Sequence, residues 1–239
     1  MALADTGFAA IGFVPPALEF LTWYVVHKTI FSLPAVPKEK RMKISLSLLF
    51  VLLAWLALAN ILGSANFFFA NSFLVPLVAF GIPYIFAKTI SGSQIYSKIA
   101  DALPNHFIIG IQLFRLLGII FLWMYAAGSL PAAFALPAGY GDILIGLTAP
   151  IVAYLYFKKI SQAKKLATLW NYVGILDLVI AMIMGPITAP TLVQLLSFDA
   201  PNAAIISYPL VTVPTFAVPF SFVLHLVSLR ILRKENSKK

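Results

Sequence analysis

The sequence contains no cysteine and few charged residues, and each shortage excludes a class of protein. Without cysteine, disulfides, thiolate metal sites, iron–sulfur clusters and cysteine nucleophiles are excluded. Only 10% of the 239 residues are charged and 61% are hydrophobic, whereas about a quarter are charged in an average soluble domain. The N-terminal segment also lacks the basic region of a secretory signal peptide. These shortages predict an integral membrane protein whose first apolar run is retained as a helix.

Apolar runs long enough to cross a bilayer recur along the whole chain. An α-helix rises 1.5 Å per residue, so about 20 residues cross a hydrocarbon core of roughly 30 Å. We predict an all-α membrane protein with one domain, residues 1–239, and seven transmembrane helices. The predicted spans lie near residues 8–33, 44–63, 73–90, 106–128, 139–157, 166–185 and 206–230.

The basic residues alternate along the chain, and this alternation predicts an orientation. The net charge is +9, and Lys and Arg follow the first, third, fifth and seventh predicted spans but are absent after the second, fourth and sixth. Because cytoplasmic loops concentrate Lys and Arg, we expect the N-terminus outside and the C-terminus in the cytoplasm. The positive charge is thus a topology signal. We expect the lipid bilayer as partner and no nucleic acid, and the oligomeric state stays open.

The three segments predicted to lie outside are apolar. They cover residues 64–71, 128–137 and 186–205. One interpretation is interfacial packing with an aromatic belt. The other is a lid over a cavity, in which residues 191–198 form a short interfacial helix.

Several landmarks recur along the chain and suggest an internal repeat. Pro15 matches Pro137 and Gly63 matches Gly185 at the same offset. This pattern predicts that spans one to three repeat in parallel as spans five to seven, with span four as the link. Such a 3+1+3 plan is similar to that of SWEET-type sugar carriers, although the Pro-Gln motif of those carriers is absent.

Apart from Lys28, Lys88 and Arg230 near the cytoplasmic ends of spans, four charged residues fall inside predicted spans: Glu19, Arg115, Asp142 and Asp177. Each costs at least a few kcal/mol within a bilayer, so each is expected to face the bundle interior with a partner. From the helical rise, Arg115 and Asp177 lie about 15–18 Å from the cytoplasmic flank, and Glu19 and Asp142 about 22–24 Å. Spans four and six run in the same direction, so we predict an Arg115–Asp177 ion pair near the midplane.

Two interpretations of these charges are open. In the first, the ion pair only stabilises packing, and the other two acids lie in first helical turns, where a carboxylate gains from the helix dipole. Glu19 would do so after Pro15-Pro16, and Asp142 at an irregular, glycine-rich start of span five. In the second, the charges line a polar cavity that binds a solute or ion.

Polar residues on three spans extend the candidate cavity. Gln112 lies one turn before Arg115, and Asn171 lies on the same helical side as Asp177. Span seven contains several prolines, so we expect a kinked backbone. Farther along the same span a second polar stripe is formed by Ser221, His225 and Ser228.

Among the three histidines, His225 is the one expected to be buried. A buried imidazole can ligate haem iron or relay protons, so a haem-binding or redox protein is an alternative, although we predict no cofactor and assign no metal ligands. Motifs of ATPases, zinc proteases and serine hydrolases are absent, which argues against an enzyme of these classes. Span seven also lacks a lysine that could form a retinal Schiff base.

Three stretches in the second half of the chain resemble a family of uncharacterised bacterial multi-spanning membrane proteins. They are Gly110-Ile-Gln-Leu-Phe-Arg-Leu-Leu-Gly118, residues 130–142 and residues 213–219 with His225-Leu-Val-Ser-Leu229. The resemblance implies a multi-pass protein of the bacterial inner membrane. Our leading hypothesis is binding or translocation of a small solute or ion through the charged cavity. The alternatives are a haem or redox protein using His225, and a non-catalytic sensor or assembly subunit.

Overall fold

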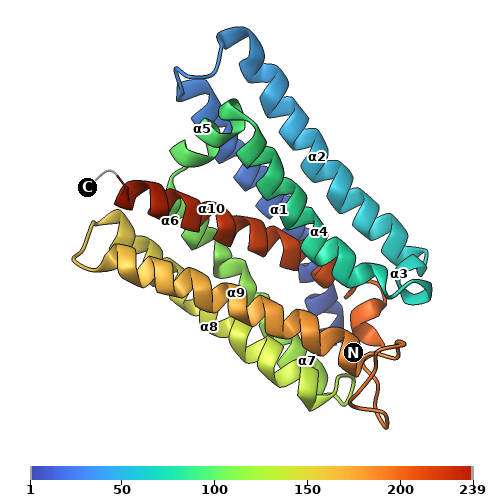
Figure 1. Cartoon of the computed structure of the whole chain (residues 1–239). Coiled ribbons are helices and arrows are strands. Elements are labelled where there is room, and N and C mark those ends of the chain that lie inside the picture. The colour runs from blue at the N-terminus through green and yellow to red at the C-terminus, as the bar shows by residue number, and fades with distance from the viewer. Residues whose placement is uncertain (1, 238–239) are drawn as a thin grey trace.

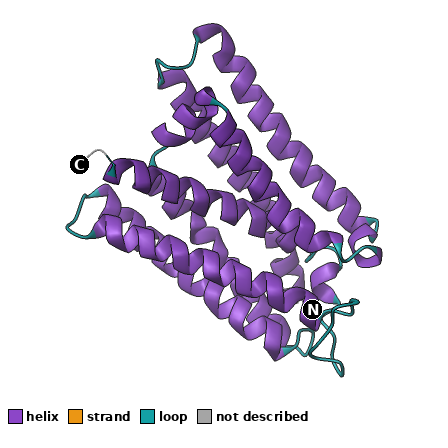
Figure 2. Cartoon of the chain, viewed as in Figure 1, coloured by secondary structure: helices purple, strands orange, loops and turns teal. Residues whose placement is uncertain are grey.

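The computed structural model describes the backbone of residues 2–237, and the side chains of residues 14–235 and 237. Every regular element in this described part is a helix, as the composition predicted (Figures 1 and 2). The elements are α1 (Ala2–Ser32), α2 (Lys38–Ser64), α3 (Phe67–Ala70), α4 (Leu74–Gly92), α5 (Gln94–Ala102), α6 (Asn105–Gly110), the 3₁₀ helix η1 (Ile111–Gly118), α7 (Ile119–Ala126), α8 (Ala132–Phe157), α9 (Ala163–Thr188), the 3₁₀ turn η2 (Ala204–Ile206), the π-helical turn η3 (Val213–Ala217) and α10 (Val218–Asn236).

Six helical stretches among the described residues are long and apolar enough to cross a membrane. They are α2, α4, the continuous stretch Asn105–Ala126 formed by α6, η1 and α7, then α8, α9, and Val213–Glu235, formed by η3 and α10. These stretches indicate a multi-pass membrane protein. The first predicted span, residues 8–33, falls on α1, a single helix of 31 residues. The side chains of its residues 8–13 lie outside the described part.

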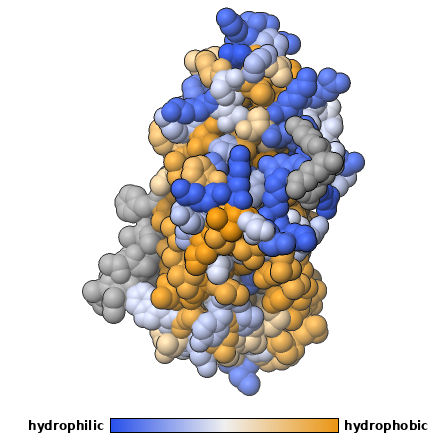
Figure 3. Space-filling model, turned by 90° about the vertical axis from the view of Figure 1, so that its left-hand side faces the viewer, coloured by the Kyte–Doolittle hydropathy of each residue, from blue (hydrophilic) through white to orange (hydrophobic). Residues whose placement is uncertain are grey.

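The two ends of the bundle differ in charge. The α1–α2 connection, α5, the α8–α9 loop and the last turns of α10 lie at one end (Figure 1). We call it the basic end, because the chain there carries the Lys and Arg residues of segments 38–43, 158–165 and 230–234. Figure 3 views the protein from the basic end and shows hydrophilic side chains in its upper part and at its centre, with mainly apolar side chains below. Helix α3, the α7–α8 loop and segment 189–203 lie at the opposite end.

Helix α10 runs through the middle of the bundle. Of its apolar window 83% is buried inside the protein, compared with 17–44% in the other five spans. It lies between α4 on one side and α9 on the other (Figure 1). Because protein encloses α10, the polar side chains of this helix must find partners on neighbouring helices rather than in water.

The interpretation that places Glu19 and Asp142 in first helical turns is wrong. Helix α8 begins at Ala132, directly after Pro131, and includes Pro137 and the glycines that follow it. Helix α1 likewise continues through Pro15 and Pro16. Neighbouring helices can satisfy the backbone groups that such prolines leave free. Glu19 and Asp142 are therefore interior helical residues, and neither lies in a first turn.

The final span starts later than predicted and is irregular at its start. Residues 208–211 form turns after η2, and the apolar span begins at Val213 with the π-helical turn η3. Pro209, Pro214 and Pro219 flank or interrupt this turn, and each lacks the N–H that a regular helix needs. The irregular backbone that the prolines predicted is thus present.

Residues 191–198 do not form the predicted interfacial helix. The backbone N–H groups of Leu195 and Leu196 both donate to the carbonyl oxygen of Ile187, each at 2.9 Å. The side-chain amide of Gln194 donates to the carbonyl of Leu196, and Ser197 has a positive φ of 58°. These bonds fold the segment back against the end of α9, so helical hydrogen bonds cannot form.

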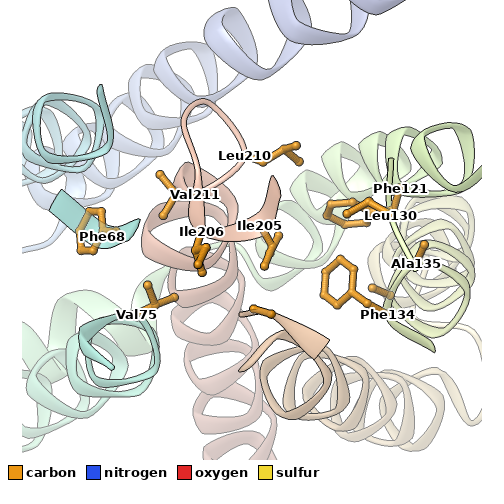
Figure 4. Close-up of a cluster of buried hydrophobic side chains, with 12 residues drawn as sticks. Phe68, Val75, Phe121, Leu130, Phe134, Ala135, Ile205, Ile206, Leu210 and Val211 are labelled. Carbon is orange, nitrogen blue, oxygen red and sulfur yellow. The ribbon is translucent and has the colours of Figure 1, made fainter. Parts of the chain in front are cut away.

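An apolar plug closes the bundle at the end opposite the basic end. Ile205, Ile206, Leu210 and Val211 pack against side chains from two groups of helices, and all of the residues concerned are at most 5% exposed. On one side lie Phe68 and Val75, and on the other Phe121, Leu130 and Phe134 (Figure 4). We call residues 204–212 the end plug. It lies between this end and the polar site at the centre of the bundle.

Candidate functional site

Arg115 joins three helices at the centre of the bundle. It lies in η1, a 3₁₀ stretch longer than the usual three to four residues, and its side chain is 2% exposed. Its Nε donates to Asp142 Oδ1 of α8 at 2.7 Å, and its Nη2 donates to Asp177 Oδ2 of α9. Its Nη1 donates to the carbonyl oxygen of Gly174 at 3.5 Å and contacts His225 Nε2 at 3.3 Å. We call Arg115, Asp142 and Asp177 the charge cluster.

The sequence analysis placed Asp177 correctly beside Arg115 but placed Asp142 too far from it. The contact between Arg115 and Asp177 is the one expected from the register of their helices. Asp142 also contacts Arg115, so it lies at the level of the cluster, and the prediction that it lies farther toward the outer end is wrong. The prediction treated the spans as straight and parallel, whereas helix tilt and a long arginine side chain bridge more than one helical turn.

Glycines allow the polar side chains of the site to lie directly against neighbouring helices. A Cβ atom added at any of three glycines would collide with a side chain of the site. Small residues of this kind let transmembrane helices approach closely. The glycine-rich stretch of span five was therefore a signal for close packing, which the sequence analysis interpreted as an irregular helix start. The three contacts are Gly118 with Asp142, Gly141 with Asp177, and Gly174 with His225.

His225 is a neutral link between Arg115 and Asn171. Asn171 Nδ2 donates to the carbonyl of Ala167 at 2.7 Å and to Ser228 Oγ at 2.9 Å, which leaves Asn171 Oδ1 as the atom that faces His225 Nδ1 at 2.9 Å. Nδ1 therefore donates, and Nε2 offers its lone pair to Arg115 Nη1. A second proton on Nε2 would face another donor, so this arrangement holds the imidazole in its neutral form.

The other predicted polar residues are also hydrogen-bonded between helices. Ser221 Oγ donates to Gln112 Oε1 at 3.0 Å, and Gln112 Nε2 donates to the carbonyl of Ser221 at 3.2 Å. Each member of the predicted stripe on α10 thus has a partner on another helix. Sequence analysis missed Trp170, whose Nε1 donates to Thr148 Oγ1 at 2.9 Å and whose ring lies 5.3 Å from that of His225. The only sequence signal that Trp170 belongs to the site was its position next to Asn171 in the chain.

Two small cavities adjoin Asp142. The larger cavity measures roughly 70 Å³ and is lined by Arg115, Asp142, Thr212 and Ser221 among apolar side chains of α1, η1 and the last span. The smaller cavity measures roughly 40 Å³ and lies between Asp142 and the end plug. Within the described part of the chain, no protein group donates a hydrogen bond to Asp142 Oδ2 or Asp177 Oδ1. The two acids therefore keep acceptor oxygens for something other than the protein.

Glu19 lies apart from the charge cluster. It is fully buried on α1, and neither of its carboxylate oxygens has a hydrogen-bond partner among the described residues. Its neighbour Leu18 lines the larger cavity together with Arg115 and Asp142. Of the six predicted cavity residues, the structure thus places five around the centre of the bundle and Glu19 apart from them.

An ionic cluster that the sequence analysis missed ties helices together at the basic end. Asp101 of α5 pairs with Arg230 Nε at 2.7 Å and Lys234 Nζ at 2.5 Å, and Lys164 of α9 pairs with Glu235 at 2.7 Å. Burial raises the pKa of Asp101, but the hydrogen bonds and charges of Arg230 and Lys234 outweigh this effect and leave the pKa below its ordinary value. We call Asp101, Arg230 and Lys234 the basic-end lock.

The described residues provide neither a free histidine ligand for haem at His225 nor a metal site with three or more side-chain ligands. Both ring nitrogens of His225 are engaged by Arg115 and Asn171, so neither lone pair is directed toward an iron, and ligation would require the ring to leave both partners. Among the residues that the structure describes, no group of three or more His, Asp or Glu side chains is arranged to hold a metal ion.

Comparison with known proteins gives a family but no activity. A family model described as a domain of unknown function (DUF8737) matches residues 72–233. This region includes the charge cluster, the polar residues of both cavities, and Asp101 and Arg230 of the basic-end lock. No curated protein and no solved structure matches the chain. Since the family model covers more than half of the chain, the protein belongs to the family described as domain of unknown function DUF8737.

Proposed function

We propose that this protein binds a small cation beside the charge cluster and carries it across the membrane. The observation that carries the proposal is the sharing of one guanidinium by two carboxylates, each of which keeps an oxygen without a protein donor among the described residues. With both acids ionised, the cluster has one uncompensated negative charge. Inside a bundle this is costly unless a proton or a cation neutralises it.

The hydrogen bonds of Arg115 favour a cation over an anion. All three nitrogens of its guanidinium already contact Asp142, Asp177, Gly174 or His225. These four contacts leave only one of the five guanidinium N–H groups for an anion, and an anion would add to the excess negative charge of the cluster. A cation can instead use the unbonded oxygen of Asp142 at the cavity wall. A cavity of roughly 70 Å³ has room for on the order of five water-sized groups. This volume suits a partly hydrated metal ion or a small ammonium ion.

We further infer a seven-span topology in a bacterial inner membrane, with α1 as the additional span, the N-terminus outside and the C-terminus in the cytoplasm. The Lys and Arg residues at the basic end support this orientation. In this orientation the end plug faces outward and the basic-end lock faces the cytoplasm, so transport would require each to open in turn. The proposed 3+1+3 repeat would relate α1, α2 and α4 to α8, α9 and α10 around the central span.

Thermal unfolding in lipid nanodiscs tests the cation site. Chloride salts of sodium, potassium, magnesium, ammonium and methylammonium are titrated at constant ionic strength into the wild type, Asp142→Asn and the control Asp199→Asn, which changes an exposed acid. One cation should raise the Tm of the wild type and the control but not of Asp142→Asn, since a ligand at 100 times its Kd adds about 2.7 kcal/mol to the free energy of unfolding. The same cation should enter vesicles that contain the wild type.

Two results would refute the proposal. One is that no cation shifts the Tm, and the other is that the shift persists in Asp142→Asn. In either case a non-catalytic sensor or assembly subunit, held together by a structural charge cluster, becomes the better explanation.

A further inference from the structure

Glu19 is a buried acid that neither the charge cluster nor the basic-end lock uses. It is 0% exposed, and both carboxylate oxygens lack hydrogen-bond partners among the described residues. One turn farther along α1, the Thr22 hydroxyl is likewise buried without a partner in the described part of the chain. Unsatisfied buried polar groups are rare in folded proteins, and each calls for an explanation such as a functional role or an occupying molecule.

No charged group in the described structure compensates Glu19. The elements packed against α1 are chiefly α2, α5 and η1. In η1, Arg115 is bonded to the charge cluster, and in α5, Asp101 is bonded to Arg230 and Lys234. The remaining charged or titratable residues with described side chains on these elements and on α1 form no hydrogen bond with Glu19. They are Tyr24, His27, Lys28, Lys38, Glu39, Lys40, Arg41, Lys43, Tyr96 and Lys98.

The ionised form of an acid in such surroundings is too costly to persist. An isolated carboxylate that is moved out of water loses more solvation free energy than the net free energy of folding, so such a group takes up a proton instead. In a membrane helix the same reasoning marks ionisable residues as sites of proton relay or ion passage. Glu19 is therefore a neutral carboxylic acid in this conformation.

The larger cavity reaches the turn of α1 that precedes Glu19. Pro15 and Leu18, on the turn before Glu19, line the larger cavity. Pro15 and Pro16 also remove two backbone donors from α1, which weakens the helix one turn before the acid. Opening of α1 at this point would let water from the cavity approach the carboxyl group.

We propose that Glu19 is a proton-binding site, which holds one proton in the conformation described and releases it as a hydronium ion when water from the larger cavity reaches α1. The step is a reversible transfer between the carboxyl oxygen and water. It makes the conformation of α1 dependent on pH. This proton site does not depend on cation binding at the charge cluster, because different residues form it.

Carbodiimide labelling tests the protonation state directly. Dicyclohexylcarbodiimide partitions into lipid and adds the O–H of a carboxylic acid across its C=N bond, so it labels buried protonated acids. The full chain in nanodiscs is treated between pH 6 and pH 9, digested and analysed by mass spectrometry. An adduct should form on Glu19 at pH 7, decrease as the pH rises, and be absent from Glu19→Gln. The exposed Glu39 serves as the internal control and should stay unlabelled.

Thermal unfolding gives a second, independent measurement. Because folded Glu19 must keep its proton, the Tm of the wild type should fall relative to that of Glu19→Gln as the pH rises from 6 to 9. Absence of the Glu19 adduct at pH 7, or a Glu19→Gln variant that is less stable at every pH, would show an ionised, partnered acid and overturn the proposal. Cation-dependent shifts through Asp142 should persist in Glu19→Gln, so the two proposals can fail separately.

Discussion

The shared guanidinium of Arg115 leads to a coupling that an isolated ion pair would not show. In a pair with two members, the second substitution removes the charge that the first one stranded, so the double variant is milder than the sum of the single variants. Arg115 has two acidic partners. Asp142→Asn or Asp177→Asn alone leaves the guanidinium neutralised by the other acid, whereas the double variant leaves it buried without a counter-charge.

The expected magnitudes follow from the contacts. Each single variant weakens one hydrogen bond between charged groups, about 1.5–3 kcal/mol, but also removes the excess negative charge, so we expect a net loss of about 1 kcal/mol. Stranding Arg115, whose side chain is 2% exposed, costs about 3–5 kcal/mol. The double variant should therefore lose about 1–3 kcal/mol more than the sum of the single variants, within the usual range for residues in one network.

Reversible unfolding in mixed micelles of increasing denaturing detergent measures these differences. The wild type, both single variants, the double variant and the exposed control Asp199→Asn are compared under one condition. Additive losses, or a double variant milder than the sum, would show that the two acids do not substitute for each other as partners of Arg115. That result would refute the sharing of the Arg115 guanidinium by both acids.

Three further predictions concern packing, charge and orientation. Gly141→Ala should lower the free energy of unfolding by about 1–3 kcal/mol, because the new Cβ would collide with the Asp177 carboxylate. Gly81 has open space around it, so the control Gly81→Ala should be neutral or stabilising. The pKa of Asp101 is lowered in the folded protein, so the contribution of Asp101 to stability is fully present above its ordinary unfolded pKa and is lost as the pH falls through the lower folded pKa. Hydrogen exchange in α5 should therefore accelerate at acidic pH in the wild type but change less in Asp101→Asn. Equal acceleration in both proteins would contradict the basic-end lock. Since the chain has no cysteine, an impermeant maleimide should label Ser64→Cys in intact cells and Lys158→Cys only after lysis, and labelling of both from outside would contradict the topology.

Much of the polar site was visible in the sequence because charges in apolar runs are conspicuous. A charged residue is costly in a bilayer wherever its helix lies, so Arg115, Asp142, Asp177 and Glu19 were selected by composition alone. The contact between Arg115 and Asp177 also followed, because a helix has a constant rise and both spans run in the same direction. Gln112 and Asn171 were found from helical spacing in the same way.

Apart from the Arg115–Asp177 pair, the sequence could not decide which of these residues meet. Asp142 joins Arg115, and Glu19 stays alone, because contacts depend on the tilt and rotation of each helix and on the glycines that let helices approach. The basic-end lock was missed for a related reason, since Asp101 and Arg230 are far apart in the chain and each resembles an ordinary charged loop residue.

Local sequence alone predicted an all-α membrane protein with seven apolar spans and one basic end, because hydropathy and loop charge act residue by residue. Of these spans, six are found as long apolar helical stretches among the described residues. Tertiary structure decided where the helices begin, since α1 and α8 continue through prolines that other helices accommodate. It also decided that residues 191–198 fold back onto α9 and that His225 links Arg115 to Asn171. These features depend on hydrogen-bond partners from distant segments, which no local pattern in the chain records.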